Sequence, residues 1–314
     1  MTFFNDPVVL NGGKALVAVL MILSNSILVF VTYKTKALNS TCNWLIAANS
    51  ACIALYSLTY FVQFGIVLLR PSGIPLWQCC LLVPVPLFFL CCQYVLFPLI
   101  ALDRLIGAIF PLKQMGNRYK HRYMFFALVA STSFGLFIVA ASVNKSIIHF
   151  SENLVFCMTS DPAPAYFANC SWALNITSAI LYLALWVRIK LLSSCVSQKT
   201  KFNDAVTRKV LFSLMVICLV EMCGWVSNWT VKLVLNQFDV TALTQWYVLS
   251  YFGFVMELTL ALNAPILYAL SSEYRKAFRA VLEQIGKTSQ QPAKALFVVP
   301  INKKNGKTND GNTI

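Results

Sequence analysis

The sequence predicts an all-α membrane protein, a seven-transmembrane helix bundle with a short amphipathic helix after the seventh span. Its 314 residues are 58% hydrophobic and only 11% charged, whereas a soluble domain carries about 25% charged residues. Seven apolar stretches reach the length of about 20 residues that crosses a bilayer. Helices are expected because a helix satisfies its backbone polar groups within its own segment. The alternating pattern of a membrane β-barrel is absent.

The seven expected spans follow one another in the chain. They cover residues 15–33, 45–69, 74–102, 123–144, 166–187, 210–231 and 240–268. The sixth and seventh spans each contain a carboxylate, Glu221 and Glu257. Ionisable residues inside a membrane are costly, and this makes both of them candidates for a functional site.

The distribution of positive charge predicts the orientation. With the N-terminus outside, 21 of the 25 Lys and Arg residues fall on the inner side. Cytoplasmic loops carry such an excess, so we predict a multi-pass membrane protein with its N-terminus outside and its C-terminus in the cytoplasm. The net charge of +14 then faces anionic membrane lipids, and nucleic acid is not an expected partner.

Four parts of the chain are expected. These are a short extracellular N-terminus (1–14), the seven-helix domain (15–270), the amphipathic helix (271–286) and a disordered cytoplasmic tail (287–314). In the third part, apolar Tyr274, Phe278 and Val281 alternate with charged residues, which is typical of a helix lying on a membrane surface. A frayed extension of the seventh span is the alternative. The tail is rich in polar residues and Gly.

Two charged residues, Asp103 and Arg104, close the third span, and Pro111 and Leu112 follow in the next loop. The carboxylate can pair with the guanidinium, whose planar fork can also reach other acceptors when helices move. An ordinary charged helix end, with the Arg stem lying along apolar surface, is the alternative.

Polar residues inside the spans suggest a second constellation. Pro265 predicts a kink in the seventh span, and Asn263 and Tyr268 stand ready to satisfy the freed backbone groups. Asn25 and Asn49 are expected to face the bundle interior, where amides hydrogen-bond between helices. Together with Asn263 they can form one network, which either holds the bundle together or relays a conformational change.

Two cysteines are expected to form a disulfide at the outer end of the bundle. Cys79 precedes Arg104 by 25 residues, roughly 37 Å along a helix, so it lies at the outer mouth of the third span. Cys157 lies in the outer loop after the fourth span, on the oxidising side. Cys80 and Cys170 are competing partners.

These features together resemble the rhodopsin-like G-protein-coupled receptors over about residues 15–285. Asp103-Arg104-Leu105 stands where that family has Asp-Arg-Tyr, and residues 45–49 match its Leu-Ala-x-x-Asp motif. Further matches are Asn25, Tyr182, the Cys79–Cys157 pair, the Pro111-Leu112 turn and Pro265-x-x-Tyr268. More narrowly, Asp-Arg-Leu-Ile-Gly-x-x-Phe-Pro-Leu is similar to the nematode serpentine chemoreceptors of the Srsx class.

The resemblance implies a chemosensory receptor that binds an extracellular small molecule or peptide and activates a heterotrimeric G protein on the cytoplasmic face. It also implies a place in the plasma membrane, including that of sensory-neuron cilia. It assigns G-protein coupling to Asp103, Arg104, Pro111 and Leu112. It assigns the activation hinge and network to Asn25, Asn49, Tyr182, Asn263, Pro265 and Tyr268.

The sequence departs from the broader family pattern at several positions. Asn49 replaces the family's Asp, so a bound sodium ion is not expected. Ala264 directly precedes the proline, and Asn263 stands one place early. The Cys223-Gly224-Trp225 run has no following Pro. These departures fit a divergent branch.

The ligand pocket is expected to use other residues than those of well-known relatives. Pro86 stands where amine receptors carry Asp, and this disfavours an amine ligand. Leu258 stands where visual pigments carry their retinal lysine, so no cofactor is expected. We expect Glu257 to line the pocket, with Glu221, Tyr94 and Trp225 as further candidates. A polar contact within the bundle, or ordinary aromatic packing, is the alternative for each.

Other classes of protein fit the sequence less well. A transporter or channel is the alternative reading, but repeated halves or a ring of charges are not visible. An enzyme would need clustered His, Asp or Glu, and two carboxylates in the bundle are too few. With only two histidines, a metal site is not expected.

Overall fold

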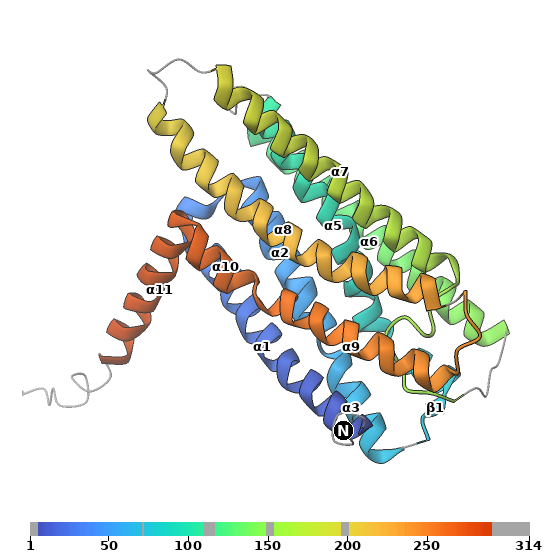
Figure 1. Cartoon of the computed structure of the whole chain (residues 1–314). Coiled ribbons are helices and arrows are strands. Elements are labelled where there is room, and N and C mark those ends of the chain that lie inside the picture. The colour runs from blue at the N-terminus through green and yellow to red at the C-terminus, as the bar shows by residue number, and fades with distance from the viewer. Residues whose placement is uncertain are drawn as a thin grey trace, which may run out of the picture.

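The apolar stretches form long helices that lie side by side in one bundle (Figure 1). The structure is a computed structural model that describes residues 6–70, 72–109, 117–148, 154–195, 201–235 and 237–290. Its helices are α1 (Pro7–Lys34), the 3-10 helix η2 (Lys36–Leu38), α2 (Thr41–Tyr56), α3 (Thr59–Leu69), α4 (Leu76–Leu82), α5 (Pro84–Ile109), α6 (Asn117–Ile148), α7 (Tyr166–Cys195), α8 (Lys201–Leu235), α9 (Ala242–Ala261), α10 (Asn263–Leu270) and α11 (Ser272–Gln290). Two short strands, β1 (Ile74–Pro75) and β2 (Leu154–Val155), pair antiparallel.

The fold is an all-α seven-helix membrane bundle. Five helical segments are long and apolar enough to cross a membrane, namely Pro7–Lys34, Thr41–Leu69, Pro84–Ile109, Lys120–Ile148 and Tyr166–Arg188. Leu243–Ala261 and Asn263–Leu270 pass the same test as one span bent by 41°. The 35-residue helix α8, which contains the predicted sixth span (210–231), runs alongside them (Figure 1) but is not among the segments that pass this test.

The helix α5 lies at the centre of the bundle. Within its most apolar window 67% of the residues are buried, compared with 22% for α6. Large apolar side chains such as Phe125 and Phe137 on α6 are instead 68% and 60% exposed, as expected of a surface that meets lipid rather than water. Helices in lipid associate through close packing rather than through hydrophobic transfer, so α5 is the element on which the others are assembled.

The first helix begins earlier than predicted. Asp6 caps α1, its Oδ1 accepting from the amide of Val8 at 2.8 Å, and Pro7 occupies the first turn. Proline is favoured there because the first turn needs no amide hydrogen. Lys14, which the sequence places before the span, therefore lies inside α1, and its side chain is buried.

The third span is not one helix from residue 74 to residue 102, and the prediction of a continuous helix is wrong. Ile74 and Pro75 form β1, and the helical chain breaks at Val83, where φ is −111° and ψ is 11°. Pro84 then opens α5, because the residue before a proline is disfavoured in the helical conformation. Cys79 consequently lies on α4, a different helix from Arg104.

The seventh span bends where its proline removes a hydrogen bond. Pro265 has no amide hydrogen for the carbonyl of Ala261, four residues earlier, and α9 ends at that residue. The Ser24 hydroxyl of α1 donates to the Ala261 oxygen at 2.8 Å, and the Asn25 amide donates to the Leu260 oxygen at 3.1 Å. The predicted kink is thus present, with α1 supplying the missing donors.

The amphipathic helix is a separate element. The chain leaves the helical conformation at Ser271, with φ −97° and ψ 117°, and the Ser271 hydroxyl accepts from the amide of Tyr274 at 3.4 Å. The helix α11 then points away from the bundle (Figure 1) and continues to Gln290, beyond the predicted end at 286. A frayed extension of the seventh span is therefore excluded. Residues 291–314, predicted to be disordered, lie outside the described residues.

Candidate functional site

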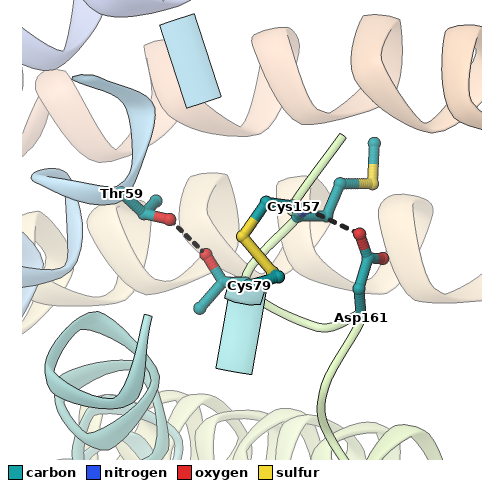
Figure 2. The surroundings of a disulfide bond; sticks show 6 residues. Thr59, Cys79, Cys157 and Asp161 are labelled. Atoms are coloured by element: carbon teal, nitrogen blue, oxygen red, sulfur yellow. Dashed lines mark hydrogen bonds between the residues drawn. A yellow bond between two sulfur atoms is a disulfide. The ribbon is translucent and has the colours of Figure 1, made fainter. Parts of the chain in front are cut away.

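A disulfide closes one end of the bundle, which we call the disulfide end. Cys79 of α4 is bonded to Cys157, with 5.3 Å between their Cα atoms (Figure 2). The predicted pairing is confirmed. The competing partners Cys80 and Cys170 are free thiols, and Cys80 instead donates to the carbonyl of Ser142 at 3.5 Å. The bond ties the loop between α6 and α7 to the helices beneath it.

Further contacts hold this loop over the bundle. The hydroxyls of Thr59 and Thr159 are 2.8 Å apart, and Asp161 Oδ2 accepts from the amide of Met158 at 2.7 Å (Figure 2). Gly73, at φ +88°, precedes β1, and a Cβ there would come within 2.8 Å of the Val155 oxygen. Only glycine fits that approach without strain.

Asp161 is the titratable group of this loop that burial affects most clearly. Burial raises the pKa of Asp161 to about 6, although Lys232, the Met158 amide and Lys145 each act to lower it. The carboxyl group therefore changes charge near neutral pH, at the base of the loop that covers the bundle.

Beneath the loop lies a small cavity of about 70 Å³. Its walls come from α1, α2, α3, α5, α8 and α9, and its cover includes Met158, Thr159 and Ser160. Three of the four predicted pocket residues, Tyr94, Trp225 and Glu257, line it. The fourth, Glu221, lies outside the lining; it is buried and near enough to Asn263 to interact with its side chain.

One wall of the cavity carries a buried ion pair. Lys14 Nζ lies 3.4 Å from Glu257 Oε1, with the two side chains 5% and 0% exposed. Tyr60 is near enough to interact electrostatically with Glu257, and its ring lies 5.7 Å from Lys14 Nζ. Gly253 provides the space, because a Cβ there would stand 3.2 Å from Lys14 Nζ. The pair links α1 directly to α9.

The sequence interpretation missed Lys14 by counting it as a residue of the outer side. The signal was present in the sequence, because Asp6 followed by Pro7 is a helix-start pattern. A helix that begins there places Lys14 two turns inside it, at a depth where a lysine needs a carboxylate partner.

Aromatic side chains form the opposite wall. The rings of Tyr94 and Trp225 are 4.9 Å apart in an edge-to-face arrangement, which is favourable for such pairs. Trp229 Nε1 donates to the Tyr94 hydroxyl at 2.9 Å, and Phe167 packs against both residues. Indole and phenol rings fixed in this way offer flat apolar faces to a ligand.

The far end of the bundle, which we call the α11 end, carries the predicted Asp-Arg pair. Both residues are half-buried. The Arg104 side chain interacts electrostatically with Cys42 of α2, with Asp103 and with Tyr274 of α11. Arg104 thus joins three elements. Pro111 and Leu112 lie outside the described residues.

The predicted activation residues occupy different surroundings. The Asn25 amide donates to the Leu260 carbonyl of α9, Asn263 lies near enough to interact with Glu221 of α8, and the buried Asn49 Oδ1 has no partner within the described residues. Tyr182 is buried in an apolar cluster with Phe97 and Met222. Tyr268 is 39% exposed and packs against Phe278 of α11. The polar contacts therefore converge on the bend between α9 and α10.

A seven-helix membrane bundle with a disulfide-tied loop over a cavity, and a surface helix after the seventh span, defines a serpentine receptor. The family described as serpentine-type 7TM GPCR chemoreceptor Srsx matches residues 18–282, and the chain belongs to this family. The family is one of receptors rather than enzymes. No curated protein matches the chain.

Proposed function

We propose that this protein is a plasma-membrane chemosensory receptor that binds an extracellular small molecule or peptide and activates a heterotrimeric G protein. The observation that supports this most strongly is the placement of two sites on one helix. Tyr94 lies in the cavity, and Arg104 lies ten residues further along α5 at the α11 end. Ten residues of helix span about 15 Å, so one rigid central element connects both.

In this proposal the cavity takes the ligand from outside the cell. The positive charge of the loops supports an outside N-terminus (1–14), a cytoplasmic α11 end and a cytoplasmic tail (287–314). The seven-helix domain (15–270) and the helix after it (271–286) then divide the work between ligand binding and membrane contact. Sensory-neuron cilia are the proposed location.

Activation is then a shift between two populations of the bundle. A ligand in the cavity touches α1, α5, α8 and α9 together, and α9 ends in the bend that Ser24 and Asn25 satisfy. A change in that bend moves α10, and with it the Asn263–Glu221 contact to α8. The G protein binds the rearranged α11 end through Asp103, Arg104, Pro111 and Leu112.

The test is expression of the full chain with a second-messenger readout while candidate agonists are screened. Once an agonist is found, Arg104→Ala is expected to abolish signalling at normal surface expression and normal agonist binding. Arg122→Ala, which removes a positive charge from α6 at the same end, is the matched control and should signal. Full signalling by Arg104→Ala would contradict the proposed coupling site.

A further inference from the structure

The charges of the cavity wall are not balanced locally. Three side chains that line it are ionised at neutral pH in their ordinary state, namely Lys14, Lys232 and Glu257. Glu257 already pairs with Lys14 at 3.4 Å. A ligand cation would have to displace Lys14 to reach this carboxylate, so Glu257 is poorly placed to bind one.

Lys232 has no such partner. In the part of the chain that the structure describes, no carboxylate oxygen lies within 4.0 Å of its Nζ, and Lys14–Glu257 is the one ion pair that close. The Lys232 ammonium donates to the Ser160 hydroxyl at 3.0 Å and lies 5.3 Å from the centre of the Trp229 ring. An ammonium has three hydrogens to donate, so Lys232 keeps donor capacity at the cavity.

The surrounding charges leave this region positive or neutral rather than negative. Asp161 is near enough to interact with Lys232, but it is not part of the cavity wall, and its Oδ2 accepts from the Met158 amide. Lys145 adds a second positive charge to the same neighbourhood. An anion that enters the cavity therefore meets Lys232 without a competing carboxylate in contact with it.

The wall beside Lys232 is flat and apolar. Trp229 separates Lys232 from the pair of Tyr94 and Trp225, and these rings line the same cavity. A ligand whose anionic group contacts Lys232 would lay its body along these rings. Buried cavities of this kind orient a ligand by a few polar groups and bind it through apolar contact.

We infer that this cavity binds a small organic anion, a carboxylate or a similar acid carried on an aromatic or alkyl body, with Lys232 contacting the acid group. This inference rests on one part of the proposed function, that the cavity binds the ligand. It does not depend on signalling through a G protein. It makes Lys232 a residue that determines the charge of the ligand, while Lys14 and Glu257 neutralise each other.

The test measures binding to the purified full-length receptor by thermal stabilisation and by calorimetry, without a G protein. The probes are phenyl, indole and hexyl bodies, each carrying a carboxylate, a carboxamide or an amine, such as indole-3-acetate, indole-3-acetamide and tryptamine. At least one carboxylate is expected to bind about tenfold more tightly than its amide and amine, the effect of one charge-assisted hydrogen bond.

Variants assign the effect to Lys232. Lys232→Gln is expected to lose that preference, and Lys232→Arg, which keeps the charge, to retain it. Lys145→Gln removes a neighbouring charge outside the cavity wall and is expected to keep most of the affinity. The inference is overturned if no carboxylate binds, if amines bind better, or if Lys232→Gln binds the acid as tightly as the wild type.

The outcomes separate this inference from the proposed function. If carboxylates bind through Lys232 but none changes second-messenger output in cells, the charge preference stands and the receptor function fails. If an amine or a neutral ligand signals through Arg104, the receptor function stands and the anion inference fails.

Discussion

The two ends of the bundle are held together by different kinds of interaction. At the disulfide end, bonds join elements far apart in sequence: the Cys79–Cys157 bridge, the Lys14–Glu257 pair and the bond from Trp229 to Tyr94. The α11 end also has long-range hydrogen bonds, from Tyr123 to the Leu99 carbonyl and from Lys120 to Asn39, but among the described residues it has no disulfide and no ion pair within 4.0 Å. An apolar cluster that includes Leu38, Leu45 and Tyr274 joins η2, α2 and α11 there. Directional bonds fix a shape, whereas apolar packing allows elements to slide.

This difference suits a protein that binds a ligand at the disulfide end and changes its helix packing at the α11 end. A cavity with fixed walls binds without a large ordering cost. An end assembled by packing can repack when a helix shifts, because interfaces of this kind have more than one arrangement. The variants below test whether the disulfide end is the more rigid of the two.

The largest effect is expected from breaking the buried ion pair. Glu257→Gln leaves Lys14 buried without its carboxylate, which costs about 3–5 kcal/mol in comparable buried pairs. The double variant Lys14→Met/Glu257→Gln removes both charges and is expected to be more stable than the single one. Thermal unfolding of the purified receptor measures this. Exposed Glu283→Gln on α11 is the control, and equal stability of Glu257→Gln and wild type would contradict the rigid-end interpretation.

The next effect is expected from the disulfide. Cys79→Ser opens a link that typically stabilises by about 2–5 kcal/mol and frees the loop over the cavity. Surface expression and the melting temperature should both fall, and ligand affinity should fall with them. Cys170→Ser removes a free thiol of α7 and should leave all three unchanged. A Cys79→Ser receptor with normal ligand affinity would show that the loop does not shape the cavity.

A pH effect is expected from Asp161. Its pKa of about 6 lies above the ordinary value of 3.8, so the folded state binds this proton more tightly than the unfolded state. The stabilisation is present below about pH 4 and is lost as the pH rises through about 6, a change on the order of 2–3 kcal/mol. Melting temperatures across this range should therefore depend on pH less in Asp161→Asn than in the wild type. Asp239→Asn, at an exposed loop position, should follow the wild-type curve.

The smallest effect is expected at the bend of the seventh span. Ser24→Ala leaves the Ala261 carbonyl without its donor, which costs about 0.5–1.5 kcal/mol. Thr132→Ala is the matched control, because that hydroxyl bonds only within its own helix. If the bend takes part in activation, Ser24→Ala should also alter basal second-messenger output, whereas Thr132→Ala should not.

The sequence was sufficient to predict most of the helices, the disulfide and the bend at Pro265. Each of these follows from the chemistry of nearby residues or from the length of an apolar stretch. It was not sufficient for residues 74 and 75, where the pairing of β1 with β2 outweighs a continuous apolar run. The break at Val83 had a local signal in Pro84, which the count of apolar residues passed over. It also missed the partner of Glu257. Counting the first span from its first run of apolar residues leaves Lys14 outside it. In addition, nothing in the spacing of residues along α1 and α9 shows that the side chains of Lys14 and Glu257 meet.

Pocket residues were easier to predict than networks. Tyr94, Trp225 and Glu257 line the cavity because their depth in the bundle follows from the length of each span. The pairing of Asn263 with Glu221, rather than with Asn25 or Asn49, depends on how α8 and α10 are rotated about their axes. Such rotation is set by packing across the whole interface and leaves no local pattern in the sequence.

The break at Val83 has a mechanical consequence for the loop over the cavity. The covalent tether from Cys157 ends on α4, a helix of seven residues, and not on α5. Along the chain, this tether reaches the central helix through one non-helical residue, Val83, which is buried with both cysteines and keeps backbone hydrogen bonds on each side, from Val83 to Cys79 and from Leu87 to Val83. The disulfide therefore fixes the loop to the bundle without bonding it to α5, the helix that carries Tyr94 and Arg104.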